Sequence, residues 1–325
     1  MNIEALSGLK GAKYAAMFLK KNNAMMAIDE STTIKTPNAS RTKNTLKLAS
    51  LATYKRIMTG SPVTKNPLDI YSQLDFLSPL ILNQNYWAFR SRYAVMVRRN
   101  FGARSTQLVV GFQRIPELNT IIEQHSYRVL KEDCLDLPDK VYQRRFVSLT
   151  PEQVKAYEEM RRFNLTEVEG RTMTSLSTLT ALIRLHQISC GHISFDDGET
   201  QALKNNRMKE LLDILDETEG KVIIWASYRF DLRHITDALK EKFGENSCAS
   251  YFGDTKDKDR QDIVEKFQDK NSELKYFVGN PSTGGYGLTL HAAHTVIYYS
   301  NTYDLEKRIQ SEDRVHRIGQ TNKVT

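Results

Sequence analysis

Cysteine is scarce in this sequence. The chain holds three cysteines among 325 residues, an odd number without a Cys-x-x-Cys pair, which excludes a disulfide framework and indicates a reducing compartment. No apolar run approaches the roughly 18 to 20 residues of a membrane-spanning helix, and residues 1–13 lack the apolar stretch of a signal peptide. Repeats with the periods typical of solenoids are also absent. We therefore expect a cytosolic or nuclear protein.

Acidic residues are outnumbered by basic ones. The 46 Lys and Arg residues exceed the 39 Asp and Glu residues by 7, a balance that favours a polyanionic partner. The length is twice the roughly 150 residues typical of one domain, so we expect two folded lobes. Apolar residues make up 40% of the chain, which is enough for packed cores and excludes a disordered chain.

One small group of residues has the composition of a metal site. His186, Cys190 and His192 lie close together in the sequence, but no second pair of ligands follows nearby. We therefore favour a buried thiol with polar neighbours over a zinc site.

Short β-prone runs alternate with helical stretches along much of the chain. Strands are expected at residues 24–28, 54–59, 221–226, 248–252, 274–279 and 295–299. The later runs are continuously apolar, as strands buried on both faces are. Between them, Leu232, Ile235 and Leu239 recur at spacings of three and four, which is typical of an amphipathic helix. This alternation predicts an α/β fold in which helices cover a parallel sheet.

The middle of the sequence follows a different pattern. Residues 82–140 are rich in aromatic residues and arginine without a clear strand pattern, so we expect an insertion. A helix is expected to begin at Thr150, where Thr can cap, Pro151 fits the first turn and Gln153 can reach back. A second helix is expected at 176–188.

Two adjacent carboxylates, Asp29 and Glu30, follow the first expected strand. Nucleotide hydrolysis needs one carboxylate to hold magnesium and another to orient the attacking water, and the end of a buried strand can hold both. Taken alone, such a pair after a strand is more often a helix cap or a solvated turn. The next strand ends in Thr59, Gly60 and Ser61, for which an ordinary β-turn is a complete alternative explanation.

Two further segments lie near the C-terminal end. Residues 282–290 are rich in glycine after a strand, so backbone amides could approach a phosphate, although a flexible turn also fits. In the next segment Gln310, Arg314 and Arg317 are spaced to share one face of a helix, with Asp313 placed to pair with Arg317. Two guanidiniums suit the charge that spreads over a departing γ-phosphate, whereas a solvated basic helix is the plainer explanation.

Taken in order and spacing, these four segments resemble the motifs of the Swi/Snf-like ATPases of helicase superfamily two. The run DRVHRIGQ at residues 313–320 is the most specific match, and the resemblance covers nearly the whole chain. The resemblance is to compact, bacteriophage-type members. The resemblance implies two RecA-like lobes with ATP and Mg²⁺ between them and double-stranded DNA across both, in the cytoplasm of a host cell. Residues 1–82 would be the C-terminal part of the first lobe, 83–145 a helical insertion over the DNA and linker, and 146–325 the second lobe with a helical protrusion.

The same resemblance assigns roles to individual residues. Asp29 would hold Mg²⁺ and Glu30 would position the water. Arg314 and Arg317 would reach the phosphate from the second lobe. Three residues would line the nucleotide: Gly285, Gly287 and Gln310. Three would couple lobe movement to hydrolysis: Thr59, Gly60 and Ser61. Three would contact DNA phosphates: Ser227, Ser282 and Thr283.

The sequence departs from the family pattern in its phosphate-binding loop. No GxxxxGK[ST] stretch occurs, since residues 8–14 carry glycines and lysines without Gly-Lys-Ser/Thr. We therefore expect the chain to begin partway through an incomplete first lobe, with an upstream segment or chain supplying that loop. Three functions stay open: an ATP-driven motor on duplex DNA, a non-catalytic DNA-binding module, and a helicase on single-stranded nucleic acid.

Overall fold

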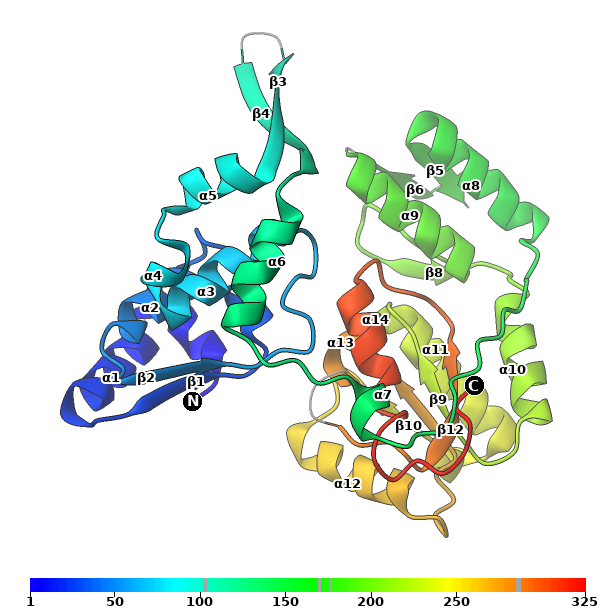
Figure 1. Cartoon of the computed structure of the whole chain (residues 1–325). Helices are drawn as coiled ribbons and strands as arrows, with labels where there is room; N and C mark the ends of the chain where they lie inside the picture. The colour runs from blue at the N-terminus through cyan, green and yellow to red at the C-terminus, as the bar shows by residue number, and fades with distance from the viewer. Residues whose placement is uncertain (102–103, 169–170, 176, 285–287) are drawn as a thin grey trace. The chain divides into compact units, whose positions relative to one another are not determined.

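The computed structural model describes residues 1–101, 104–168, 171–175, 177–284 and 288–325 (Figure 1). The chain divides into two compact units, Met1–Val129 and Leu130–Thr325. Their boundary falls inside the expected insertion. Within the described ranges, no helix is long and apolar enough to cross a membrane.

Unit 1 begins with a two-stranded parallel sheet and the helices packed on it. Its elements are a 3-10 helix at Ile3–Ser7, α1 (Leu9–Lys21), β1 (Met25–Ile28), a 3-10 helix at Ser31–Ile34, α2 (Ser40–Ala49), β2 (Tyr54–Ile57), a 3-10 helix at Pro67–Ile70, α3 (Tyr71–Leu77) and α4 (Pro79–Leu82). Register pairs Met25 with Tyr54 and Ile28 with Ile57, so both strands end at the same edge. Ile28 packs with Ile34, Ala49 and Phe76, which covers one face of the sheet.

The second half of unit 1 corrects one expectation. The elements are α5 (Tyr86–Tyr93), β3 (Ala94–Phe101), β4 (Arg104–Phe112) and α6 (Ile115–Gln124). The insertion at 83–145 was expected to be helical, but within it β3 and β4 form an antiparallel hairpin that extends away from α5 and α6 (Figure 1). The β-branched residues Val95, Val97, Val109 and Val110 favour strands, while arginines and a register shift after Val95 hide the alternation.

Unit 2 is built on a four-stranded parallel sheet in the order β10-β11-β9-β12. Its strands are β9 (Lys221–Trp225), β10 (Cys248–Tyr251), β11 (Tyr276–Gly279) and β12 (Ala293–Tyr298). Around it lie α7 (Lys131–Cys134), α10 (Arg207–Glu217), α11 (Arg229–Phe243), a 3-10 helix at Glu245–Ser247, α12 (Asp257–Gln268), α13 (Pro281–Gly284) and α14 (Leu305–Glu312). Every residue of β9 is buried, with Val222 and Ile224 in one core and Ile223 and Trp225 in the other. The predicted α/β fold class with parallel sheets is therefore confirmed.

A smaller layer in unit 2 has its own core. It contains α8 (Pro151–Phe163), β5 (Leu165–Val168), β6 (Arg171–Thr174), α9 (Thr178–Cys190), β7 (His192–Ser194) and β8 (Thr200–Ala202). Met160, Ile188 and Ile193 are fully buried there. Helix α8 begins as predicted, with a capping box between Thr150 and Gln153.

Candidate functional site

The predicted carboxylates and coupling residues of unit 1 lie at one edge of its sheet. Asp29 and Glu30 follow β1, and the turn with Thr59, Gly60 and Ser61 follows β2. Backbone bonds continue past the strands, because Met58 N donates to Ile28 O at 2.8 Å and Ser31 N donates to Met58 O at 3.0 Å. The two polar segments are thus held side by side.

Glu30 has an unusual backbone conformation. Its φ is +51° and its ψ is +60°, in the left-handed region that L-residues other than glycine seldom adopt. Its backbone N–H donates to Asp29 Oδ1 at 3.0 Å. Such strain persists only where the surroundings determine the backbone conformation, and it is concentrated at functional sites.

Asp29 offers a ligand of the kind that Mg²⁺ takes. Its carboxylate is exposed at the strand end, and no group of three or more His, Cys, Asp or Glu ligands occurs in the part of the chain that the structure describes. Mg²⁺ keeps several waters and binds through one or two carboxylates plus substrate phosphates. An exposed carboxylate therefore fits the ion.

Hydrogen bonds to two buried side chains, Asp69 and Gln73, support the turn after β2. Asp69 Oδ2 accepts from Thr64 N at 3.2 Å, Thr64 Oγ1 at 3.0 Å and Lys65 N at 2.8 Å. Gln73 of α3 donates to Pro62 O at 2.7 Å and accepts from Ser31 Oγ at 2.7 Å. Nothing in the spacing of the sequence pointed to Gln73.

The predicted DNA contacts of unit 2 come together at the carboxyl edge of its sheet. Ser227 follows β9, and Ser282 and Thr283 lie on α13 after the neighbouring strand β11. Ser282 is exposed, and the other two are half-buried.

Two side chains that the sequence analysis missed hold this edge. Asn280 Nδ2 donates to Ser227 O at 3.1 Å, and its Oδ1 accepts from Ser282 N at 2.8 Å. Ser300, after β12, accepts from Ser227 N at 2.8 Å. The Asn-Pro step at 280–281 was the available signal, because Asn before Pro favours a turn.

Arg314 and Arg317 meet at one acceptor. Each donates from Nη1 to Leu288 O, at 3.4 Å and 3.2 Å respectively. The predicted helix face is wrong for these two residues, since α14 ends at Glu312 and turns follow. Gln320 Nε2 draws the turns back onto the sheet by donating to Ala293 O at 2.8 Å.

The predicted pairing of Asp313 with Arg317 is also replaced. Asp313 Oδ1 pairs with Lys131 Nζ at 2.7 Å and with Lys140 Nζ at 3.4 Å. Burial lowers the pKa of Lys140, but Asp313 and Glu312 outweigh it and leave that pKa raised. These lysines neutralise the acidic side chains beside the two arginines.

The structure describes one of the three residues that were predicted to line the nucleotide. Gln310 lies on α14, where its Nε2 donates to Glu306 Oε1 at 3.5 Å. Gly285 and Gly287 fall outside the described residues.

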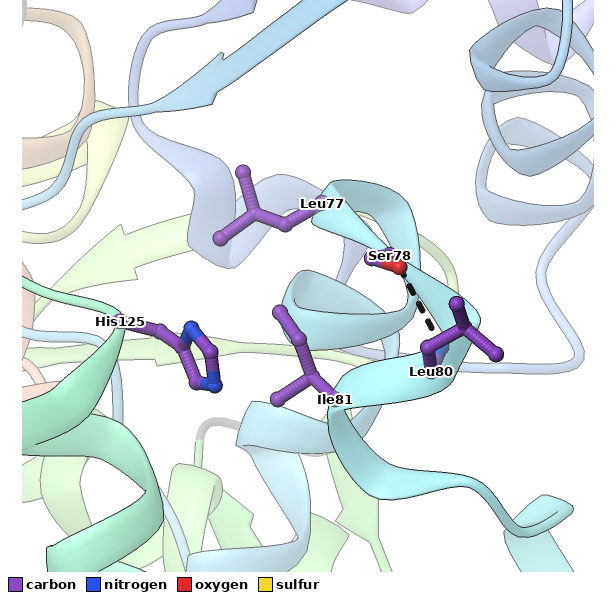
Figure 2. A pocket seen from close by; sticks show the side chains of 5 residues that line it. All are labelled: Leu77, Ser78, Leu80, Ile81 and His125. Atoms are coloured by element: carbon purple, nitrogen blue, oxygen red, sulfur yellow. Dashed lines mark hydrogen bonds between the residues drawn. The ribbon is translucent and has the colours of Figure 1, made fainter.

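A cavity in unit 1 lies apart from these groups. It measures about 410 Å³ and is lined by Leu77, Ser78, Leu80, Ile81 and His125 (Figure 2). None of the predicted site residues lines it, so it takes no part in the arrangement above.

Comparison with known proteins matches both halves of the chain to families. The model of the SNF2-related domain matches residues 2–193, and that of the helicase conserved C-terminal domain matches 203–319. The chain is 27% identical over 319 residues to the SWI/SNF chromatin-remodeling complex subunit snf22 of Schizosaccharomyces pombe, covering 92% of this chain and 19% of that protein. It is 27% identical over 309 residues to the putative ATP-dependent helicase/translocase YwqA of Bacillus subtilis, covering 91% of this chain and 32% of that protein.

The chain is also similar to solved structures. The Sulfolobus solfataricus SWI2/SNF2 ATPase core in complex with dsDNA shares 25% sequence identity with the chain, with a TM-score of 0.44, covering 95% of this chain and 65% of that one. The chain thus spans less than a third of the two curated relatives and about two thirds of this ATPase core.

Proposed function

The chain belongs to the family of the SNF2-related domain, and from this membership we propose that it couples ATP hydrolysis to movement on double-stranded DNA. The observation that carries the proposal is the strand-end cluster of unit 1. There Asp29 and Glu30 lie beside the turn of Thr59, Gly60 and Ser61, held by the bond from Ser31 N to Met58 O. A metal-binding carboxylate, a water-orienting carboxylate and a hydroxyl-bearing turn at one edge suit nucleotide hydrolysis.

In this proposal each carboxylate has one task. Asp29 holds Mg²⁺, which would neutralise charge on the phosphate oxygens when bound. Glu30 orients the attacking water, and its left-handed backbone conformation places this carboxylate at the point where the chain leaves β1. Thr59 and Ser61 respond to the state of that carboxylate pair, because the backbone bonds keep the two segments adjacent.

Unit 2 supplies the positive charge. Arg314 and Arg317 donate to the carbonyl of Leu288, a neutral acceptor that a phosphate oxygen can replace. Gln310, Gly285 and Gly287 would line the nucleotide beside them. Charge spread over the departing phosphoryl group is then stabilised by two fixed guanidiniums.

DNA would be held by its backbone in both units. In unit 2, Ser227, Ser282 and Thr283 would donate to phosphates, which positions a duplex without reading its sequence. In unit 1, residues 76–116 contain six arginines and no Asp, Glu or Lys. Arg98 and Arg99 are exposed on β3, which supports a phosphate-binding role for the hairpin.

The phosphate-binding loop is part of the proposal as well. Because residues 1–325 hold no GxxxxGK[ST] stretch, we propose that another segment or chain supplies it. We also propose that the protein is of the compact, bacteriophage type and acts in the cytoplasm of a host cell.

Assays of ATP hydrolysis and of triplex displacement test this function, in a protein that includes the phosphate-binding loop. Duplex DNA should stimulate ATP hydrolysis more than single-stranded DNA, and the protein should displace a third strand from a triplex only with ATP. The variant Glu30→Gln should lose both activities. Equal stimulation by the two DNA forms without displacement would reject duplex translocation, and stronger stimulation by single-stranded DNA would favour the single-strand helicase.

A non-catalytic DNA-binding module is the second candidate, favoured by the missing phosphate-loop motif. On this alternative, residues 1–325 bind duplex DNA and hydrolyse no ATP even beside the loop-bearing segment. Turnover that depends on Glu30 would exclude it.

A further inference from the structure

A buried side chain links the two segments that meet at the edge of the unit 1 sheet. Ser31 and Gln73 are 0% exposed, and the Ser31 hydroxyl donates to Gln73 Oε1 at 2.7 Å across 42 positions of sequence. Gln73 Nε2 in turn donates to Pro62 O at 2.7 Å and Asp69 O at 2.9 Å. Ser31 directly follows Glu30, and Pro62 directly follows Ser61.

The geometry fixes the orientation of this amide. Both acceptors of Nε2 are backbone carbonyls, which can only accept, so the amide nitrogen must face them and the oxygen must face Ser31. Reversing the amide would place its oxygen against two carbonyl oxygens. Gln73 therefore holds its two neighbours in one arrangement, and a shift of either would break a buried hydrogen bond.

We infer that Gln73 is a positioning residue that transmits displacement between the carboxylate segment, residues 29–31, and the coupling turn, residues 59–62. This inference deepens the proposed function, on which its link to ATP hydrolysis rests. Helix α3 anchors the link, since its residues Leu74 and Phe76 are buried in two different cores of unit 1. The hydrogen-bonded chain then runs from Ser31 through Gln73 to Pro62, beside the backbone bond from Ser31 N to Met58 O.

Amide hydrogen exchange on residues 1–325 tests the link without ATP or DNA. The perturbing variant is Thr59→Ala, which removes the acceptor of the 3.2 Å bond from Ser61 N. In an otherwise unchanged chain, this variant should speed exchange at residues 29–33 as well as at 59–64. In the Ser31→Ala and Gln73→Leu backgrounds, the added change at 29–33 should shrink to what the backbone bond from Ser31 N to Met58 O transmits alone.

A matched control separates transmission from general loosening. Gln153 of unit 2 is also buried and donates to Ile188 O at 2.8 Å, so Gln153→Leu removes a comparable amide. That variant should leave the transmitted change at 29–33 intact. Transmission that persists undiminished in the Ser31→Ala and Gln73→Leu backgrounds, or its absence in the unchanged chain, would overturn the inference.

A kinetic measurement then connects the link to turnover. In the protein that carries the phosphate-binding loop, Gln73→Leu should lower the DNA-stimulated kcat about tenfold and leave KM for ATP within about twofold. An unchanged kcat would overturn the role in turnover. Failure of the proposed function is distinguishable, because an inactive parent protein leaves the exchange result as it was.

Discussion

Arg314 and Arg317 share the carbonyl oxygen of Leu288 as an acceptor, at 3.4 Å and 3.2 Å. Two like charges are thereby held together, although the helix that precedes them has ended at Glu312. Leu290 N closes the arrangement by donating to Arg314 O at 3.0 Å. The two guanidiniums therefore converge because of the turns that follow α14 and the contacts of these turns with Leu288 and Leu290, before β12.

The backbone strain at Glu30 predicts a difference between two substitutions. Glycine adopts a φ of +51° without a steric penalty, whereas alanine does not. Glu30→Gly should therefore be about 1 kcal/mol more stable than Glu30→Ala, although both lose the carboxylate. Urea unfolding followed by circular dichroism measures the difference, and equal stabilities would contradict the strain.

The ion cluster around Glu312 predicts a pH-dependent stability. Burial raises the pKa of Glu312, but bonds from Arg308, Tyr142 and Lys140 outweigh it, so that pKa falls below its usual 4.5. A lowered folded-state pKa contributes stability above the unfolded value that is lost as pH falls through the folded value. Glu312→Gln should lower the free energy of unfolding by about 2 kcal/mol at pH 7. This difference should shrink as the pH falls below 4.5.

Fluorescence of Trp225, which is fully buried in unit 2, reports this unfolding. The exposed Glu241 provides the control, since Glu241→Gln should leave the stability within about 0.5 kcal/mol at every pH. If Glu312→Gln lowered the free energy of unfolding as much at pH 3.5 as at pH 7, the ion cluster around Glu312 would not account for the lost stability.

The arginines of β3 predict the salt dependence of DNA binding. Replacing Arg98 and Arg99 with alanine should weaken duplex binding and reduce the slope of log K against log salt by about 2. Arg92→Ala is the control, because Arg92 Nε already pairs with Glu117 at 2.8 Å and should change the slope less. Fluorescence anisotropy at several salt concentrations gives the slopes. An unchanged slope in the double variant would remove the hairpin from the DNA interface.

Thiol reactivity should separate the three cysteines. Cys134 is exposed, whereas burial raises the pKa of both Cys190 and Cys248 to about 12. Since the thiolate is the reactive form, one thiol per folded chain should react with Ellman's reagent at pH 8, and three after unfolding. The buried state of Cys190 agrees with its expected structural role. Rapid reaction of a second thiol would contradict that burial.

Sequence patterns predicted the parts of the fold that depend on local order. The buried strand β9 and the capped helix α8 carry their signals within a few residues, as does the Asp29-Glu30 pair after β1. The strand ends then follow from parallel pairing, which brings carboxyl ends to one edge.

Such local patterns could not predict contacts between residues that lie far apart in the sequence. The bond between Ser31 and Gln73 depends on how α3 packs. The position at which α14 ends depends on the hydrogen bond from Gln320 Nε2 to Ala293 O. The spacing of Gln310, Arg314 and Arg317 in the sequence contains no information about that bond. In the hairpin, the register shift after Val95 breaks the alternation that would have marked β3.

The proposal that Glu30, Arg314 and Arg317 act on one terminal phosphate is best tested by single-turnover ATP hydrolysis, in a protein that includes the phosphate-binding loop. Glu30→Gln, Arg314→Ala and Arg317→Ala should each slow the chemical step by about 100-fold or more, with ATP affinity changed by less than about fivefold. The Glu30→Gln, Arg314→Ala double variant should be little slower than either single one, because groups that act as a unit are not additive. Full hydrolysis rates in the arginine variants, or independent multiplicative losses, would mean that the carboxylate and the guanidiniums do not act on the same phosphate.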